Sequence, residues 1–205
     1  NLGDILRAVA AAMHWPVVII LIFFLLAAVA LLGSLLAEYL TERRHMRLAL
    51  PELLEQLQHT DDLRGTIAQS GLLRRQRDAL TLLASYPDFS PELRQALAVQ
   101  LLDAEQGRFD RIVRFSELTA RLAPMFGLLG TLIPLGPGII ALGQGDTFTL
   151  SSSLLTAFDT TVAGLLAAAV ATVVSAVRKS WYKEYVSALE VLMQCVLDRE
   201  QEARP

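Results

Sequence analysis

Charged side chains are unevenly distributed along this chain, and three long stretches contain almost none. Residues 16–37 form a charge-free run of 22 positions. As a helix, this run would span about 33 Å, enough to cross a hydrocarbon core of about 30 Å. Two further apolar runs occupy residues 122–145 and 150–177, and only Asp159 interrupts the last one. This pattern predicts an all-α integral membrane protein with three transmembrane helices.

The charged stretches set the boundaries of the expected parts. A cleaved signal peptide is the alternative for the first run, but the run exceeds the usual 7–15 apolar residues and its basic residues follow it. We therefore expect an uncleaved anchor. The expected parts are an external segment (1–15), transmembrane helix 1 (16–37), a cytoplasmic helical insert (38–121), transmembrane helix 2 (122–142), an external loop (143–150), transmembrane helix 3 (151–177) and a cytoplasmic C-terminal helix (178–205).

The insert has helix signals of its own, which predict long cytoplasmic helical extensions. Ser90 is a good N-cap, and Pro91 suits the first helical position. Gly107 is expected to separate the helix that begins there from the one leading into the second span. Arg74, Arg75 and Arg77 are expected to form a solvated face, close to anionic lipid.

Basic residues predict the orientation of the spans. Of the 18 lysines and arginines, 17 fall within residues 43–121 or 178–204, and only Arg7 precedes the first span. Because basic residues favour the cytoplasmic side, Asn1 is expected outside and the C-terminus inside. We expect a multi-pass protein of the inner (cytoplasmic) membrane.

Composition excludes several classes of function. Only 19% of the residues are charged, the net charge is −3, and no basic stripe with interleaved aromatics points to nucleic acid. The single Cys195 excludes an internal disulfide and a multi-cysteine metal site. No nucleophile-elbow, zinc-protease or phosphate-loop motif occurs. We therefore expect no enzyme, no cofactor and no metal.

Spans two and three each carry a face of small and hydroxylated residues. Such faces permit close helix packing in lipid, so a packing seam is one interpretation. An ion path lined by hydroxyls is the other. The candidate packing and kink residues are Pro124, Gly127, Gly130, Pro134, Gly138 and Gly164, and the candidate ion-pathway residues are Thr131, Thr160, Thr161 and Asp159.

The relative depth of the polar residues depends on how far span three projects into the cytoplasm. Thr131 lies about 15 Å beyond Arg121, whereas Thr161 lies about 25 Å from Arg178. The threonines are level only if span three extends some 10 Å further, which is the arrangement we favour. Asp159 then lies within the membrane, where a carboxylate costs about 2.5–3.5 kcal/mol on insertion scales. The alternative is an interfacial aspartate.

Two motifs resemble those of a known family. Residues 123–131 read A-P-M-F-G-L-L-G-T, and residues 161–165 read T-V-A-G-L. These are similar to the second-span A-P-x-x-G-L-x-G-T and the third-span T-x-x-G-L of the MotA/TolQ/ExbB proton channel family. The order of spans resembles the three-span ExbB/TolQ branch. The chain departs from that branch in lacking a proline at 168–171 and in carrying Pro134 and Pro137.

The resemblance implies the channel-forming subunit of an ion-driven, by default proton-driven, motor complex. It also implies a homopentamer around a single-span ExbD/TolR/MotB-like subunit that carries a membrane aspartate. Such a complex would act as a stator in energy transduction, for example in protein transport. Two alternatives remain open on the residues alone. One is a non-conducting helical membrane scaffold, and the other is a stand-alone proton-coupled transporter using Asp159.

Overall fold

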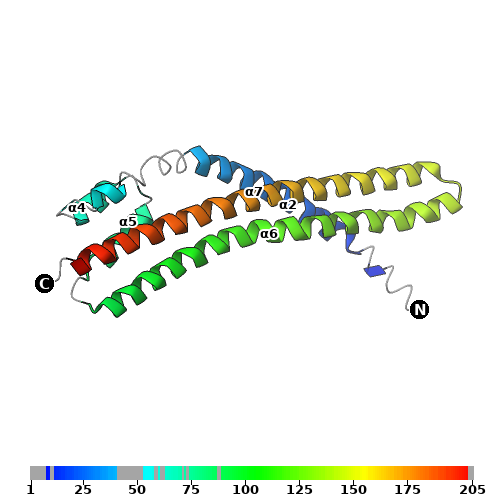
Figure 1. Cartoon of the computed structure of the whole chain (residues 1–205). Helices are drawn as coiled ribbons and strands as arrows, with labels where there is room; N and C mark the ends of the chain where they lie inside the picture. Colours follow the sequence, from blue (N-terminus) through cyan, green and yellow to red (C-terminus); the bar gives the residue numbers. More distant parts are fainter. Residues whose placement is uncertain are drawn as a thin grey trace. The chain divides into compact units, whose positions relative to one another are not determined.

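In the computed structural model, the described residues are 8–9, 12–40, 53–57, 60, 63–70, 72, 74–86 and 89–202. Most of the expected external segment 1–15 and residues 41–52 of the insert lie outside this set. The named elements are helices: α2 (His14–Glu38), α4 (Leu63–Gln69), α5 (Arg74–Leu83), α6 (Pro91–Gly143) and α7 (Thr147–Glu202) (Figure 1). The expected all-α class is confirmed, and three helices are long and apolar enough to cross a membrane.

Helices α6 and α7 are longer than the separate segments expected from the sequence. Helix α6 has 53 residues and runs through Gly107 without a break, so the expected interruption there is wrong. A single glycine costs a helix only about 1 kcal/mol relative to alanine, which its neighbours readily offset. Three prolines, including Pro124 and Pro134, also lie inside this helix. The 56 residues of α7 join the expected third span and C-terminal helix into one element.

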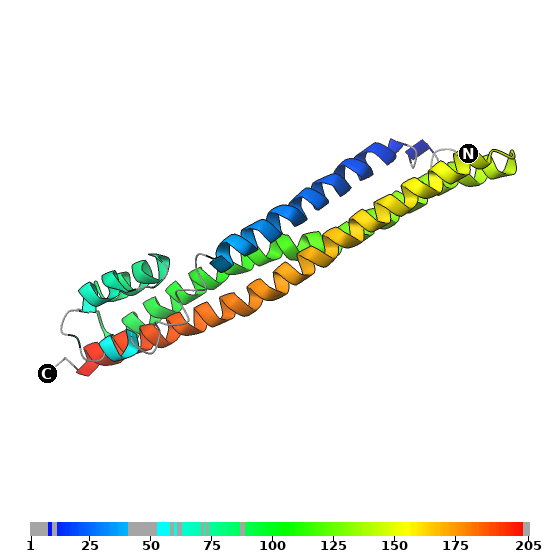
Figure 2. The same ribbon diagram turned by 90° about the horizontal axis from the view of Figure 1, so that it is seen from above.

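The chain divides into two compact units, which we call the membrane unit and the polar unit. The membrane unit comprises Asn1–Ser34 and Val113–Val177. In it, α2 lies along α6 and α7 (Figure 2), and a small core forms where Phe24 and Ala28 meet Ala123, Ala167 and Ala168.

The polar unit comprises Leu35–Ile112 and Arg178–Pro205. Its core forms where leucines of the insert, among them Leu57 and Leu80, pack on the C-terminal part of α7, which contributes Leu192. The predicted N-cap of α6 is confirmed, because the Leu93 N–H donates to Ser90 Oγ at 3.3 Å. A buried core of its own makes this unit a packed helical domain rather than a loose loop.

The turn between α6 and α7 has only three residues, shorter than the expected loop 143–150. Gly145 has φ of +80°, and the Asp146 N–H donates to the Ala141 carbonyl at 2.9 Å. Glycine takes this left-handed conformation without the steric cost that other residues meet, and the bond pattern is that of a Schellman C-cap. Asp146 then caps α7, because the Thr149 N–H donates to its Oδ1 at 3.0 Å.

This cap predicts a pH-dependent stability of the turn. Hydrogen bonds from the Thr149 hydroxyl and N–H lower the pKa of Asp146. A lowered folded-state pKa stabilises the fold above the unfolded pKa, about 4, and this contribution is lost as the pH falls through the folded value. Asp146→Ala should therefore lower the thermal midpoint at pH 7 and have less effect near pH 3. Asp146→Asn should keep the cap without titrating, so its midpoint should fall less than that of the wild type between pH 7 and pH 3. A fall as large as that of the wild type would contradict the assignment.

Candidate ion pathway

The two longest helices meet in the membrane unit through residues without bulky side chains. A Cβ placed on Gly130 would lie 2.6 Å from Thr160 Cβ, and one on Gly164 would lie 2.7 Å from the Ala123 carbonyl oxygen. Real Cβ atoms almost never come so near another heavy atom. Glycine at both positions is therefore what lets the backbones approach this closely.

The same contacts fix how α6 and α7 are aligned. Gly127 faces Gly164 and Thr160, Gly130 faces Thr160, and Gly138 faces Ser153. Numbers rise along α6 as they fall along α7, so the helices are antiparallel. Since Gly130 is level with Thr160, Thr131 and Thr161 differ in height by only about two residues, or 3 Å. Of the two alignments that the sequence allowed, the structure has the one with level threonines.

The predicted kink residues occupy different places in this seam. Pro134 is buried, as are Gly127, Gly130 and Gly138 of the seam, whereas Pro124 is half-buried one turn before Gly127. Neither proline ends α6. Prolines are tolerated in membrane helices because neighbouring groups can satisfy the backbone oxygens that they leave.

Each threonine hydroxyl donates its single proton to a backbone carbonyl of its own helix. Thr131 Oγ1 donates to Leu128 O at 2.6 Å, and Thr161 Oγ1 donates to Ala157 O at 3.0 Å. Thr160 Oγ1 lies within 3.0 Å of two carbonyls, those of Thr156 and Ala157. A hydroxyl also carries two acceptor lone pairs. These oxygens can therefore accept hydrogen bonds from water or a hydrated proton without rearranging.

Helix geometry places Thr131 and Thr161 on the same side of the seam. One residue further along a helix turns by about 100° about its axis. Because α6 and α7 run in opposite directions, stepping on from Gly130 to Thr131 and from Thr160 to Thr161 turns both side chains to one side. Both threonines are half-buried there. We call this side of the helix pair the threonine face.

Helix α2 packs on the other side of the pair. Phe126 precedes Gly130 by four residues, which turns it away from the threonine face. Its ring centroid lies 5.8 Å from that of Phe24 in α2. Val170, which is turned to the same side of α7, packs against the same core. The threonine face is thus left uncovered by α2.

Asp159 is turned away from the threonine face. It comes one residue before Thr160, so it projects about 200° around α7 from Thr161. It is exposed in the single chain, and it accepts no hydrogen bond from a described residue. The nearby Thr156 hydroxyl donates instead to Ser152 O at 3.0 Å. The structure therefore brings Thr131, Thr160 and Thr161 together but separates them from Asp159.

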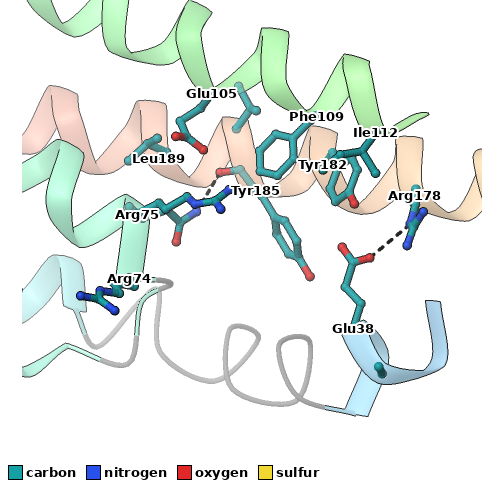
Figure 3. A pocket seen from close by; sticks show the side chains of 13 residues that line it. Glu38, Arg74, Arg75, Glu105, Phe109, Ile112, Arg178, Tyr182, Tyr185 and Leu189 are labelled. Atoms are coloured by element: carbon teal, nitrogen blue, oxygen red, sulfur yellow. Dashed lines mark hydrogen bonds and ion pairs between the residues drawn. The ribbon is translucent and has the colours of Figure 1, made fainter. Parts of the chain in front are cut away.

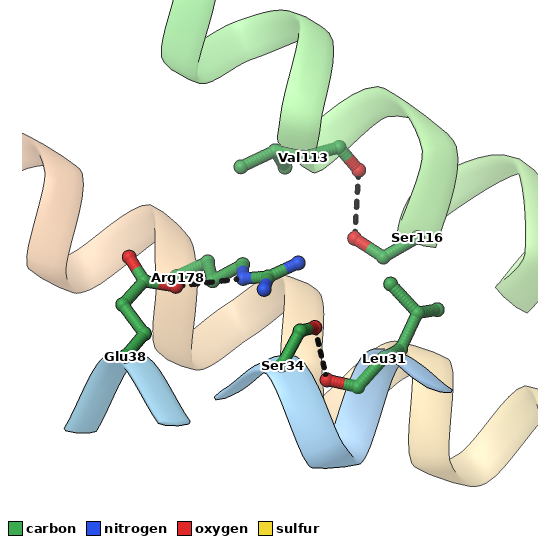
Figure 4. Close-up of polar contacts among 6 residues, drawn as sticks. All are labelled: Leu31, Ser34, Glu38, Val113, Ser116 and Arg178. Carbon is green, nitrogen blue, oxygen red and sulfur yellow. Dashed lines mark hydrogen bonds and ion pairs between the residues drawn. The ribbon is translucent and has the colours of Figure 1, made fainter. Parts of the chain in front are cut away.

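Several polar residues were not singled out from the sequence. Ser116 and Thr119 of α6 are almost fully buried, and the Ser116 hydroxyl donates to Val113 O at 2.7 Å (Figure 4). In the polar unit, Arg178 Nε donates to Glu38 Oε2 at 3.2 Å, with both side chains largely buried. The two partners lie 140 positions apart in the sequence, so no local sequence pattern reveals the pair. The described residues contain no cluster of three histidine, cysteine or acidic side chains that could hold a metal.

The fold and the seam together define a multi-pass helical membrane protein whose two long helices pack closely against each other at glycine residues. The family model of the MotA/TolQ/ExbB proton channel family matches residues 41–191. The chain belongs to this family, which consists of proton channels rather than enzymes. No curated protein and no solved structure matches the chain.

Proposed function

We propose that this protein is the channel-forming subunit of an ion-driven motor complex and that several copies form a ring around a single-span partner. Protons are the default ion. In this arrangement the threonine faces of the copies line the path, and the partner's membrane aspartate carries the charge. The complex turns ion-motive force into mechanical work. Membership in a proton channel family supports this role.

The observation that carries the proposal is the threonine face. Residues 122–177 contain no lysine or arginine, so no fixed cation would repel protons along this face. The hydroxyls of Thr131 and Thr161 lie on one side of the closely packed helix pair, and they provide hydrogen-bond acceptors at nearly the same depth. Because α2 covers the opposite side, a ring with α2 outermost turns every threonine face inward. The uneven distribution of basic residues supports an inner-membrane protein with Asn1 outside and Pro205 in the cytoplasm.

Large exposed apolar side chains support assembly with other chains and with lipid. On the two long helices, Leu128, Ile139 and Phe158 are each at least 60% exposed in the single chain. Hydrocarbon tails cover some of this surface, and neighbouring copies in a ring cover the rest.

Co-purification tests the assembly. The chain is expressed with a candidate single-span partner that carries a membrane aspartate, extracted in mild detergent and weighed by native mass spectrometry. We expect a closed ring, with five copies by family resemblance, that retains the partner. A lone monomer without partner would contradict the role and favour a non-assembling transporter. A ring that binds no aspartate-bearing partner would favour the scaffold.

Asp159 is assigned a separate part in ion handling or partner contact. A carboxylate inside an apolar run is costly without such a part, and residues 122–177 offer no cation to pair with it. Asp159→Asn keeps the shape of the side chain but cannot titrate. We expect this variant to transport ions with an altered pH dependence, measured as flux into vesicles across a pH series. A pH profile of ion flux equal to that of the wild type would mean that Asp159 takes no part and that the partner's aspartate alone carries the charge.

A further inference from the structure

A cavity of about 560 Å³ lies within the polar unit, among α5, α6, α7 and the end of α2 (Figure 3). One part of its lining is apolar and aromatic. Phe109 and Tyr182 stack there with ring centroids 4.3 Å apart, and Ile112 and Leu189 extend the surface. These side chains offer a surface suited to hydrocarbon.

A buried amide provides a hydrogen-bond acceptor at the cavity. Gln76 is only 4% exposed, and its Nε2 donates to the Tyr185 carbonyl at 3.3 Å. Only the amide nitrogen can donate to a carbonyl, so this bond fixes which way the amide points. Its Oε1 is buried and has no hydrogen-bond partner among the described residues. A buried acceptor left unsatisfied is unfavourable, and a ligand hydroxyl or N–H group at this position would satisfy it.

Two arginines next to Gln76 supply positive charge. Arg74 and Arg75 line the cavity from α5, and both are exposed. Neither makes an ion pair with a described residue. The Arg178 guanidinium, by contrast, is already paired with Glu38. Arg75 therefore offers a guanidinium to an anionic group beside the apolar lining, and Arg74, whose side chain is directed away from it in Figure 3, adds positive charge that outweighs the carboxylate of Glu105 in the same lining.

The place of the lining residues in the sequence indicates the source of the ligand. Glu38 is the first charged residue after the apolar run 16–37, and Arg178 is the first after the run that follows Asp159. Both line the cavity. With these two residues at the polar ends of the proposed membrane spans, lipid of the adjacent leaflet is the nearest source of a ligand with both an anionic group and an apolar part.

We propose that this cavity binds an anionic glycerophospholipid with a hydroxylated headgroup, taken from the adjacent leaflet. The phosphate binds Arg75 with added attraction from the charge of Arg74, a headgroup hydroxyl donates to Gln76 Oε1, and the start of an acyl chain covers Phe109 and Ile112. A soluble phosphate compound would use the arginines and leave the apolar lining uncovered.

Native mass spectrometry of the full-length protein, with its partner where it has one, tests the site. Phosphatidylglycerol is the probe, and phosphatidylcholine and phosphatidic acid are the comparison lipids. We expect one phosphatidylglycerol per chain, bound in preference to phosphatidylcholine. Removing both charges in Arg74→Gln/Arg75→Gln should weaken phosphatidylglycerol binding by about 30-fold. The control Arg108→Gln/Arg111→Gln removes two charges of the same unit outside the cavity and should leave binding unchanged.

Gln76→Met tests the headgroup contact separately. It keeps the length of the side chain but removes the strong acceptor. We expect phosphatidylglycerol binding to fall about fivefold while binding of phosphatidic acid, which lacks the headgroup hydroxyls, stays the same. The variant also loses the hydrogen bond to the Tyr185 carbonyl, but it removes the unsatisfied buried Oε1 as well, so the thermal midpoint of lipid-free protein should change little. An intact midpoint distinguishes this result from misfolding.

Three results would overturn the proposal. One is equal retention of phosphatidylglycerol and phosphatidylcholine. Another is equal loss of binding in the control and in Arg74→Gln/Arg75→Gln. The third is displacement of phosphatidylglycerol by millimolar glycerol phosphate, which would identify the ligand as a soluble phosphate. None of these results depends on ion flux, so the site can fail while the channel role stands.

Discussion

Replacing Gly164 by alanine is expected to destabilise the membrane unit and abolish assembly. The new methyl group would lie 2.7 Å from the Ala123 carbonyl oxygen and 2.9 Å from Gly127 Cα. Both are backbone atoms, so no side-chain rotation relieves the clash, and α6 and α7 must separate. Overpacking of this kind costs about 1–3 kcal/mol and occasionally more. The thermal midpoint and the native mass in mild detergent measure the effect.

Two comparisons make this result specific. Gly136→Ala adds the same methyl group to α6 where, apart from the adjoining turns of the helix itself, no described atom lies within 4 Å, and it should keep the midpoint of the wild type. Gly130→Ala would meet Thr160 Cβ at 2.6 Å, so adding Thr160→Gly should restore much of the loss. A Gly164→Ala variant as stable and as fully assembled as Gly136→Ala would show that the seam is not packed as described.

Replacing Thr131 or Thr161 by valine is expected to abolish ion-driven work while the complex still assembles. Valine nearly preserves the volume of threonine but offers no oxygen to water or a hydrated proton. Both hydroxyls donate only to their own helices, so their loss should not open the seam. The driven process is measured in cells, and assembly is measured by native mass spectrometry.

Matched variants separate the hydroxyl from the packing. Thr→Ser at either position keeps the oxygen and should keep the activity. Thr156→Val removes a hydroxyl of α7 that donates to Ser152 O and is turned away from the threonine face, so it should have little effect. Joint loss of assembly and activity in Thr161→Val would favour a packing seam, and full activity in both valine variants would remove the threonines from the path.

The sequence predicted the class of this fold because its main determinants are local. Twenty or more apolar residues in a row suffice to identify a membrane helix, and small residues at helical spacing identified the seam. Gly127, Gly130 and Gly164 are the residues at which the helices approach most closely. The cap at Ser90 was also predictable, since its signal lies within four residues.

Other features depend on contacts between distant residues and could not be predicted. Helix α6 continues through Gly107 because flanking turns and packing outweigh a weak local preference. The pair of Glu38 with Arg178 joins residues 140 positions apart, and Gln76 meets Tyr185 across 109 positions. The side of the helix pair that Thr161 occupies became clear only when Thr160 was seen to face Gly130.

Proton flux into proteoliposomes tests the central claim, that the threonine faces of assembled copies line an ion path, most directly. The complex of this chain with the proposed single-span partner is reconstituted with a pH-sensitive dye inside the vesicles, and a potential is imposed. We predict uptake that requires both proteins and that falls to the level of empty vesicles in the Thr131→Val/Thr161→Val variant. Uptake at the wild-type rate in that variant, with assembly intact, would contradict the account.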